Sequence, residues 1–173
     1  KVTDIIIRAG GLKNEAYPRA SVFIRNNEII KLSFDEIIEN PRSKLNFSVT
    51  DGDLIRINEK PNLVKVEGDV NNPGNFQFIK GKRLNDYLKI AGGLTTNAAK
   101  RSIHIIYPDG TSKRHSYLKI SPKVLDGSVI KVGKKEDVEP FNITEYVSSL
   151  TGIYSDLIQA YLMIKVLAQD VSS

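Results

Sequence analysis

The residue types that could do chemistry are few in this chain of 173 residues. Cysteine is absent, and the two histidines are His104, inside an apolar stretch, and His115, next to Lys113-Arg114. No glutamate stands at metalloprotease spacing from either histidine, and there is no cysteine nucleophile, so no known catalytic pattern is present. The sequence therefore predicts no enzymatic activity, no catalytic residue, no cofactor and no metal site.

Two further motifs favour turns over binding sites. In Asp51-Gly52-Asp53 two carboxylates could face a cation, but a calcium loop needs more oxygen ligands at fixed spacing, and none follow. Asp and Gly are both turn formers, so this run is typical of a turn into a strand. The pairs Gly10-Gly11 and Gly92-Gly93 follow a predicted helix instead of opening one, so they predict helix ends and not phosphate loops.

Basic residues are the main chemical signal, and they gather in the middle of the chain. Residues 61–135 carry 14 basic and 5 acidic side chains. Their net charge is +9, whereas the net charge of the whole chain is +5. The candidate binding residues for an acidic polymer are Lys82, Arg83, Lys113 and Arg114. A solvated surface is the plain alternative. Nucleic acid is disfavoured, because stacking aromatics are scarce among these residues and no recognition helix is visible.

An internal repeat organises the chain that carries these residues. The run Ala9-Gly10-Gly11-Leu12 recurs as Ala91-Gly92-Gly93-Leu94, at an offset of 82. Further on, residues 51–55 match residues 126–130 at an offset of 75, so the first copy holds seven extra residues, assigned to the loop at 40–46. The sequence thus predicts a duplicated unit, at 1–60 and 61–135.

The second copy can be followed element by element. Val64, Val66 and Val70 alternate with polar residues, as in a half-buried strand, and residues 71–74 (Asn-Asn-Pro-Gly) predict a type II turn with Gly74 at positive φ. A helix follows, predicted by apolar residues at Leu84, Tyr87, Leu88 and Ala91. Two strands, one helix and further strands make a β-grasp unit of the α+β class. Only the helix and the later strands recur in the first copy, which therefore lacks its opening hairpin; that hairpin is expected upstream of Lys1 or from another segment.

The last segment, residues 141–170, predicts an amphipathic helix. A heptad stripe of apolar residues runs through it: Ile143, Val147, Leu150, Tyr154, Leu157, Tyr161, Ile164 and Ala168. Polar residues such as Ser155, Asp156 and Gln159 lie off the stripe. The residues from Val147 to Ile164 on this stripe are therefore predicted to serve membrane association or oligomerisation, although a helix packed on its own domains fits the pattern too.

Three runs of the second copy, at 66–76, 91–94 and 125–130, resemble the soluble-ligand-binding β-grasp (SLBB) family. Tandem SLBB units followed by a C-terminal helix are similar to outer-membrane polysaccharide export proteins. The resemblance implies a periplasmic and outer-membrane component of a capsular or exopolysaccharide export channel, acting as an oligomeric scaffold and conduit.

The partners implied by this resemblance are the polysaccharide, further copies of the chain, the outer membrane through the C-terminal helix, and an inner-membrane polysaccharide co-polymerase, with no nucleic acid. A free-standing carbohydrate- or small-ligand-binding module and, less well supported, an RNA-binding domain are the alternatives. Neither would need a long amphipathic helix.

Overall fold

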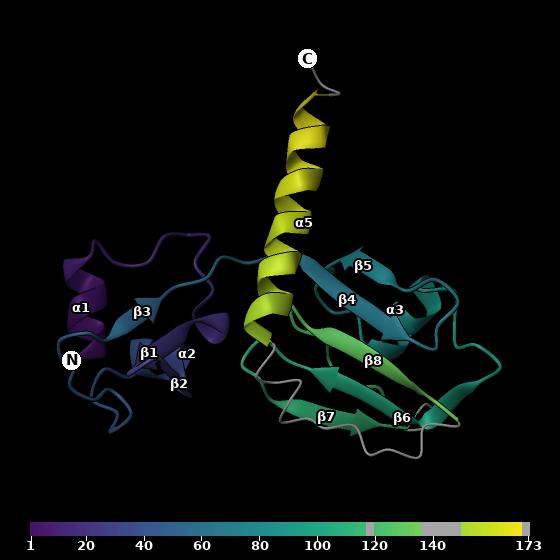
Figure 1. Ribbon diagram of the computed structural model, residues 1–173, viewed down its shortest axis with the longest axis horizontal. Coiled ribbons are helices and arrows are strands. Elements are labelled where there is room, and N and C mark those ends of the chain that lie inside the picture. Colours follow the sequence, from purple (N-terminus) through teal and green to yellow (C-terminus); the bar gives the residue numbers. More distant parts are fainter. Residues whose placement is uncertain (117–119, 136–149, 171–173) are drawn as a thin grey trace. The chain divides into compact units, whose positions relative to one another are not determined.

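The computed structural model describes residues 1–116, 120–135 and 150–170, and in the last range the side chains of residue 152 and residues 154–163. The chain divides into two compact units, Lys1–Lys60 and Pro61–Ser173. Each unit combines helices with a β-sheet of its own (Figure 1). The α+β class predicted from the sequence is therefore confirmed.

The first unit contains a three-stranded antiparallel sheet in the order β2-β1-β3. Its elements are α1 (Val2–Arg8), a 3-10 turn (Pro18–Ala20), β1 (Val22–Arg25), β2 (Glu28–Ile30), α2 (Phe34–Glu39) and β3 (Leu54–Arg56). A two-residue turn joins β1 to β2, and both of its residues, Asn26 and Asn27, have positive φ (51° and 63°). Asparagine tolerates this left-handed backbone better than most residues, which explains the sharp hairpin.

Apolar side chains from both helices and the sheet close the core of the first unit, and they include Val2, Ile6, Phe23, Phe34 and Ile37. At its edge the Arg25 guanidinium lies 5.3 Å from the ring centres of Phe23 and Phe47. The same guanidinium donates two hydrogen bonds to the Asp53 carboxylate, at 2.7 and 2.6 Å.

This ion pair lowers the pKa of Asp53 well below its usual range, chiefly through the hydrogen bonds from Arg25. The Thr50 backbone N–H also donates to Asp53. The turn predicted at 51–53 is thus confirmed, and the Asp53 carboxylate stabilises it.

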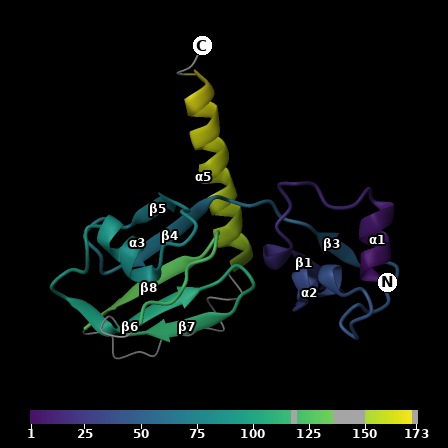
Figure 2. The ribbon, with the colours of Figure 1, turned by 180° about the vertical axis from the view of Figure 1, so that it is seen from behind.

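The second unit is built on a five-stranded sheet in the order β5-β4-β8-β6-β7. Its elements are β4 (Leu63–Gly68), β5 (Gly74–Gln77), α3 (Leu84–Ile90), β6 (Ala98–Ile106), β7 (Ser112–His115), β8 (Val129–Lys134) and α5 (Leu150–Asp170). Neighbouring strands are antiparallel except β4 and β8, which run parallel in the middle of the sheet. Helix α3 lies along one face of this sheet, as the front and back views of Figures 1 and 2 show.

Helix α3 forms where the apolar spacing predicted it. Leu84, Tyr87, Leu88 and Ala91 are all buried, and they pack with alternate residues of β4, β6 and β8 into one core. The Tyr87 hydroxyl accepts a hydrogen bond from the Ile79 backbone N–H at 2.8 Å, which ties the helix to the end of the hairpin. Leu94, which follows the two glycines after the helix, is half-buried and packs against this core.

The hairpin turn corrects one prediction. Gly74 does not have positive φ and instead opens β5, so the predicted type II turn with Gly74 in the left-handed region is wrong. The left-handed residue is Gly68, at φ 88°, where β4 ends. A Cβ at Gly68 would lie 2.0 Å from the carbonyl oxygen of Val132, because β4 and β8 run side by side at this point.

The turn after Gly68 is fixed to the end of α3. Asn71 and Asn72 donate their backbone N–H groups to the carbonyl oxygens of Gly93 and Ala91, at 3.0 and 2.9 Å. The Asn71 side chain donates to the Gly92 carbonyl oxygen. Gly92 has φ 76°, which confirms the left-handed helix end predicted from the sequence. These bonds satisfy carbonyl groups that a helix terminus leaves without partners inside the helix.

The two units share part of their topology. Strands β2-β1-β3 of the first unit have the same order and directions as β7-β6-β8 of the second. Each unit also has a short helix that ends in two glycines with positive φ, Gly10-Gly11 and Gly92-Gly93. The first unit, all of whose residues are described, contains no counterpart of β4 and β5.

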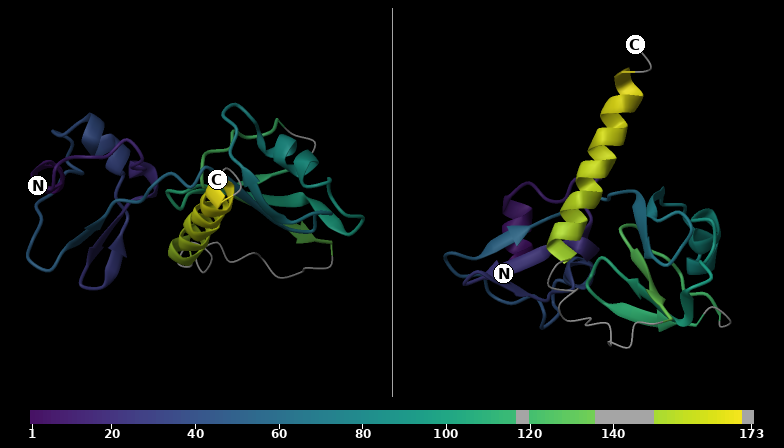
Figure 3. Two further views of the ribbon diagram at one scale, coloured as in Figure 1. Left: turned by 90° about the horizontal axis from the view of Figure 1, so that it is seen from above. Right: turned by 45° about the vertical axis from the view of Figure 1, so that its right-hand side comes forward.

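Helix α5 belongs to the second unit and covers residues 150–170, while residues 141–149, which were also predicted helical, lie outside the described residues. Tyr154 and Leu157 are buried. Tyr154 lies over Gly127, where its Cε2 atom is 3.1 Å from the position of a Cβ on that glycine. The right-hand view of Figure 3 shows α5 extending away from the sheet. Within the described part of the chain, no helix is both long and apolar enough to cross a membrane.

Candidate functional site: the basic surfaces of the second unit

The candidate residues Lys82 and Arg83 stand at the start of α3. The Arg83 backbone N–H donates to the Asp86 carboxylate at 2.8 Å, which caps the first turn of the helix. The Arg83 guanidinium donates to the Ser121 carbonyl oxygen at 2.8 Å. Arg83 is exposed and Lys82 half-buried, so both ammonium and guanidinium groups can meet solvent from the same end of the helix.

Lys113 lies on the same face of the sheet as α3. It is paired across the sheet with Ile105, a residue of the core beneath α3. Its ammonium group lies 6.0 Å from the centre of the Tyr107 ring. The Tyr107 hydroxyl donates to the Lys123 carbonyl oxygen. The backbone of Lys123 in turn forms an isolated antiparallel β-bridge with the backbone of Arg83. Tyr107 and the backbone of Lys123 therefore link Lys113 to Arg83 on this side of the sheet.

Arg114 lies on the opposite face of the sheet. Successive side chains of a strand point to opposite faces, so Arg114 is separated by the sheet from its neighbour Lys113. Arg114 is paired across the sheet with His104, and its Nε donates to the Arg101 carbonyl oxygen at 2.9 Å. The structure thus brings Lys82, Arg83 and Lys113 to one side and leaves Arg114 on the other.

On the side of Arg114 the structure places two residues that sequence reasoning did not select, His104 and Lys131. Residue Lys131 of β8 is paired with His104 of β6, which is paired in turn with Arg114 of β7. These three residues lie in one row across three neighbouring strands. The alternation of side chains along a strand could have indicated that Arg114 lies on the other face from Lys113. The partners of Arg114, in contrast, follow only from the registers of three strands.

The two histidines lie on opposite faces. His115 is buried on the α3 side, with its Nε2 3.2 Å from the Asn85 side-chain oxygen, and burial lowers its pKa. Burial also lowers the pKa of His104, and the positive charges of Arg114 and Lys131 lower it further. Among the described residues, no group of three or more His, Cys, Asp or Glu side chains is arranged to hold a metal ion.

The predicted assembly residues of the C-terminal segment are placed only in part. Tyr154 and Leu157 are buried and Tyr161 is half-buried. Val147 lies outside the described residues, as do the side chains of Leu150 and Ile164. Among the side chains of α5 that the structure describes, the large apolar ones that are exposed are Leu162 and Met163, which lie off the heptad stripe.

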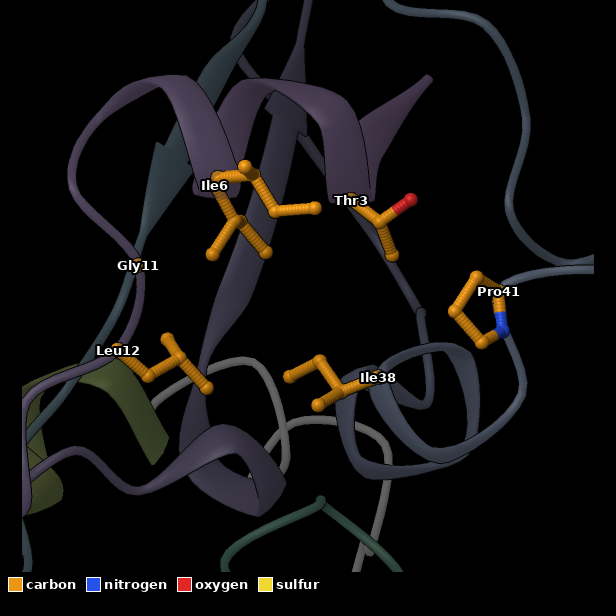
Figure 4. A pocket seen from close by; sticks show the side chains of 7 residues that line it. Thr3, Ile6, Gly11, Leu12, Ile38 and Pro41 are labelled. Atoms are coloured by element: carbon orange, nitrogen blue, oxygen red, sulfur yellow. The ribbon is translucent and has the colours of Figure 1, made fainter.

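The first unit contains an apolar pocket of about 300 Å³ between α1 and α2 (Figure 4). Its lining residues are Thr3, Ile6, Ile7, Gly11, Leu12, Ile38 and Pro41. Ile38 and Pro41 come from the stretch around the insertion of the first copy. The pocket offers a single hydroxyl group, from Thr3, for polar recognition, so its lining suits an apolar side chain better than a sugar.

Comparison with known proteins identifies the class of the second unit. Residues 63–113, from β4 into β7, match the SLBB domain, so the chain carries an SLBB domain. The resemblance seen in the sequence is thereby confirmed. Two curated relatives, both polysialic acid transport proteins KpsD of Escherichia coli, are 35% identical over 77 residues and 36% identical over 75 residues. These alignments cover 44% and 43% of this chain but only 14% and 13% of the relatives.

Proposed function

We propose that the chain is part of a capsular or exopolysaccharide export channel, where it acts as an oligomeric scaffold and conduit in the periplasm and at the outer membrane, without enzymatic activity. The observation that carries this proposal is the SLBB domain together with the similarity to polysialic acid transport proteins. The polymer, further copies of the chain, the outer membrane and an inner-membrane polysaccharide co-polymerase are the proposed partners.

The proposal includes two β-grasp units in tandem. Two observations support a β-grasp fold for the first unit: the strand order shared by the two sheets, and the paired glycines that end α1 and α3. The first unit lies outside the residues matched by the SLBB domain.

The basic residues of the second unit, which lie on both sides of its sheet, are proposed to contact an acidic polymer weakly. Changing Lys82, Arg83, Lys113 and Arg114 together to Glu is expected to weaken binding of polysialic acid by about tenfold or more, since a local field concentrates counter-charged ligands by factors of this size. Binding is measured by biolayer interferometry against immobilised polymer at two salt concentrations. The parent should lose affinity as salt rises, because exposed charges are screened beyond about 8 Å at physiological salt.

The matched control changes four exposed basic residues of the first unit, Arg8, Lys13, Lys31 and Lys44, to Glu. It alters the net charge by the same amount and should bind nearly as the parent does. Equal weakening in both variants, or none in either, would show that the selected residues are only a solvated surface.

Helix α5 is proposed to mediate assembly through its exposed part. Tyr154 and Leu157 are already buried, so Leu162 and Met163 are the described apolar side chains that can meet another copy. Burial of each side chain contributes about 1.5–3 kcal/mol to association. Changing both to Gln is therefore expected to convert an oligomer into a monomer, measured as the mass of the chain in detergent by sedimentation.

The control for this experiment changes two exposed polar residues of the same helix, Asp156→Asn and Gln159→Ala. It should keep the oligomer. A parent chain that is already monomeric, or a Leu162 and Met163 variant that keeps its mass, would remove this assembly role.

A further inference from the structure

One edge of the sheet in the first unit has no partner strand. In the second unit the matching edge belongs to β8, which pairs in parallel with β4 of the β4–β5 hairpin. There the Asp69 backbone N–H donates to the Val132 carbonyl oxygen at 3.0 Å. The repeat makes β3 the counterpart of β8, but β3 pairs with β1 alone. Within the first unit, whose residues are all described, the other edge of β3 is therefore unpaired.

The helix above this edge is uncovered on the same side. In the second unit Tyr87 and Ala91 of α3 pack with apolar side chains of β4, and both are 0% exposed. The residues at the same places in α1 are Ile5, which is 41% exposed, and Ala9, which is exposed as well. Val2 is fully buried, so α1 is docked on its sheet while its Ile5 side meets solvent.

The strand shows the same difference. Ile130 and Val132 of β8 are 0% and 1% exposed, whereas their counterparts Ile55 and Ile57 are only half-buried. Since Val132 turns its carbonyl towards β4, and backbone groups alternate along a strand, the N–H groups of Ile55 and Ile57 face the unpaired edge.

These four apolar residues, Ile5, Ala9, Ile55 and Ile57, are called the hairpin seat. They border an unpaired strand edge, and covering them would remove further apolar surface from water. The second unit shows what covers the corresponding residues there, namely a β-hairpin that both adds a parallel strand and packs on the helix.

We propose that the hairpin seat is filled by a β-hairpin built like β4–β5, supplied by the polypeptide that runs ahead of α1. This proposal rests on the tandem β-grasp arrangement put forward above. In the second unit the hairpin directly precedes its helix. At the offset of 82 that relates α1 to α3, the counterpart of the hairpin would stand shortly ahead of Lys1. Its first strand then lies parallel to β3, as β4 lies parallel to β8.

The seat also defines the residues that the hairpin must carry. Alternate positions of its first strand are apolar, as Val64 and Val66 are in β4, because they enter the core beneath the helix. A glycine stands opposite Ile57, as Gly68 stands opposite Val132, where the neighbouring backbone leaves no room for a Cβ. The turn that follows offers backbone N–H groups to the carbonyl groups at the end of α1, as residues 71–72 do at the end of α3.

The test adds a second copy of residues 61–82 directly ahead of Lys1 in the complete chain, so that the copy precedes α1 as the original precedes α3. Hydrogen exchange at the Ile55 and Ile57 amides is followed by NMR. The added hairpin is expected to slow this exchange by about tenfold or more relative to the unextended chain, because the new strand must first separate from β3. Unchanged exchange overturns the proposal.

A matched control carries the same extension with Val64→Asp and Val66→Asp in the added copy only. Charged side chains cannot enter the core without a large cost, so exchange should remain as fast as in the unextended chain. Gly68→Ala in the added copy should likewise lose most of the slowing. Equal slowing by the parent and the control hairpins would show that strand addition at the seat is not the cause.

The seat itself is tested in the extended chain with Ile5→Asp. This side chain is exposed before the hairpin binds, so the first unit should stay folded while the slowing is lost. Ile29→Asp, at a residue that is 53% exposed on β2 at the other edge of the sheet, is the control and should keep the slowing. Loss of the slowing in both variants would contradict the assignment of the seat.

Two results separate this proposal from the others. If the unextended chain already exchanges slowly at Ile55 and Ile57 and sediments as a dimer, a second copy covers the seat and a preceding hairpin is not its occupant. If the seat fills but the chain does not retain polysialic acid in the binding assay, the hairpin seat stands while the export role is overturned. Retention of the polymer without any effect of the added hairpin would overturn the seat alone.

Discussion

Gly68→Ala is expected to destabilise the second unit by about 2–5 kcal/mol. The left-handed backbone of Gly68 costs a residue with a Cβ about 1–2 kcal/mol. The new Cβ would also lie 2.0 Å from the Val132 carbonyl oxygen, and overpacking of this kind adds about 1–3 kcal/mol or more. The obstacle is backbone of the parallel partner strand, so β4 must move away from β8 and the middle of the sheet must open.

Gly93→Ala is the matched control for this change. Gly93 has nearly the same φ, 83° against 88°, but a Cβ there meets nothing within 4 Å. Its loss of stability should stay at about 1–2 kcal/mol, the conformational cost alone. Urea unfolding followed by the ring signals of His104 and His115 measures both variants, because both histidines lie in the second unit. Equal losses for the two glycines would show that β4 and β8 are not packed as closely as described.

The contrast between Gly68 and Gly74 shows what local sequence could and could not predict. Asn-Pro-Gly is a strong turn signal, and a turn does form there, but the choice of Gly74 as the left-handed residue was wrong. Gly68 is required by the approach of Val132, some 60 residues further along the chain. No turn rule contains that contact, because it depends on the parallel pairing of β4 with β8.

Helix α3 was predictable because its signal is local. Leu84, Tyr87, Leu88 and Ala91 recur at helical spacing, and the glycine that follows accepts a left-handed backbone. The basic residues were harder to place. Alternation along a strand separates Lys113 from Arg114, but the neighbours of Arg114 depend on the registers of β7 with β6 and of β6 with β8.

The C-terminal stripe shows a similar limit. A heptad pattern predicts that one side of a helix is covered, and Tyr154 and Leu157 are indeed buried. The pattern does not identify what covers them, since packing on the same unit and packing on another copy need the same apolar side chains. Here Tyr154 lies over Gly127, so the first turns of α5 pack on the second unit. Leu162 and Met163, further along the helix, stay exposed.

Leu88→Ala is expected to cost about 2–5 kcal/mol, as truncation of a fully packed leucine does when the cavity cannot collapse. Leu88 is 1% exposed and lies in the core between α3 and the sheet. Ile90, two residues later on the same helix, is 43% exposed, so Ile90→Ala should cost no more than about 1 kcal/mol. Unfolding in urea, read from the His104 and His115 rings, compares the two. The first unit, followed by the amide signal of Phe23 in its core, should unfold at the same urea concentration in both variants. Similar losses for Leu88 and Ile90 would mean that α3 does not close the core of the second unit.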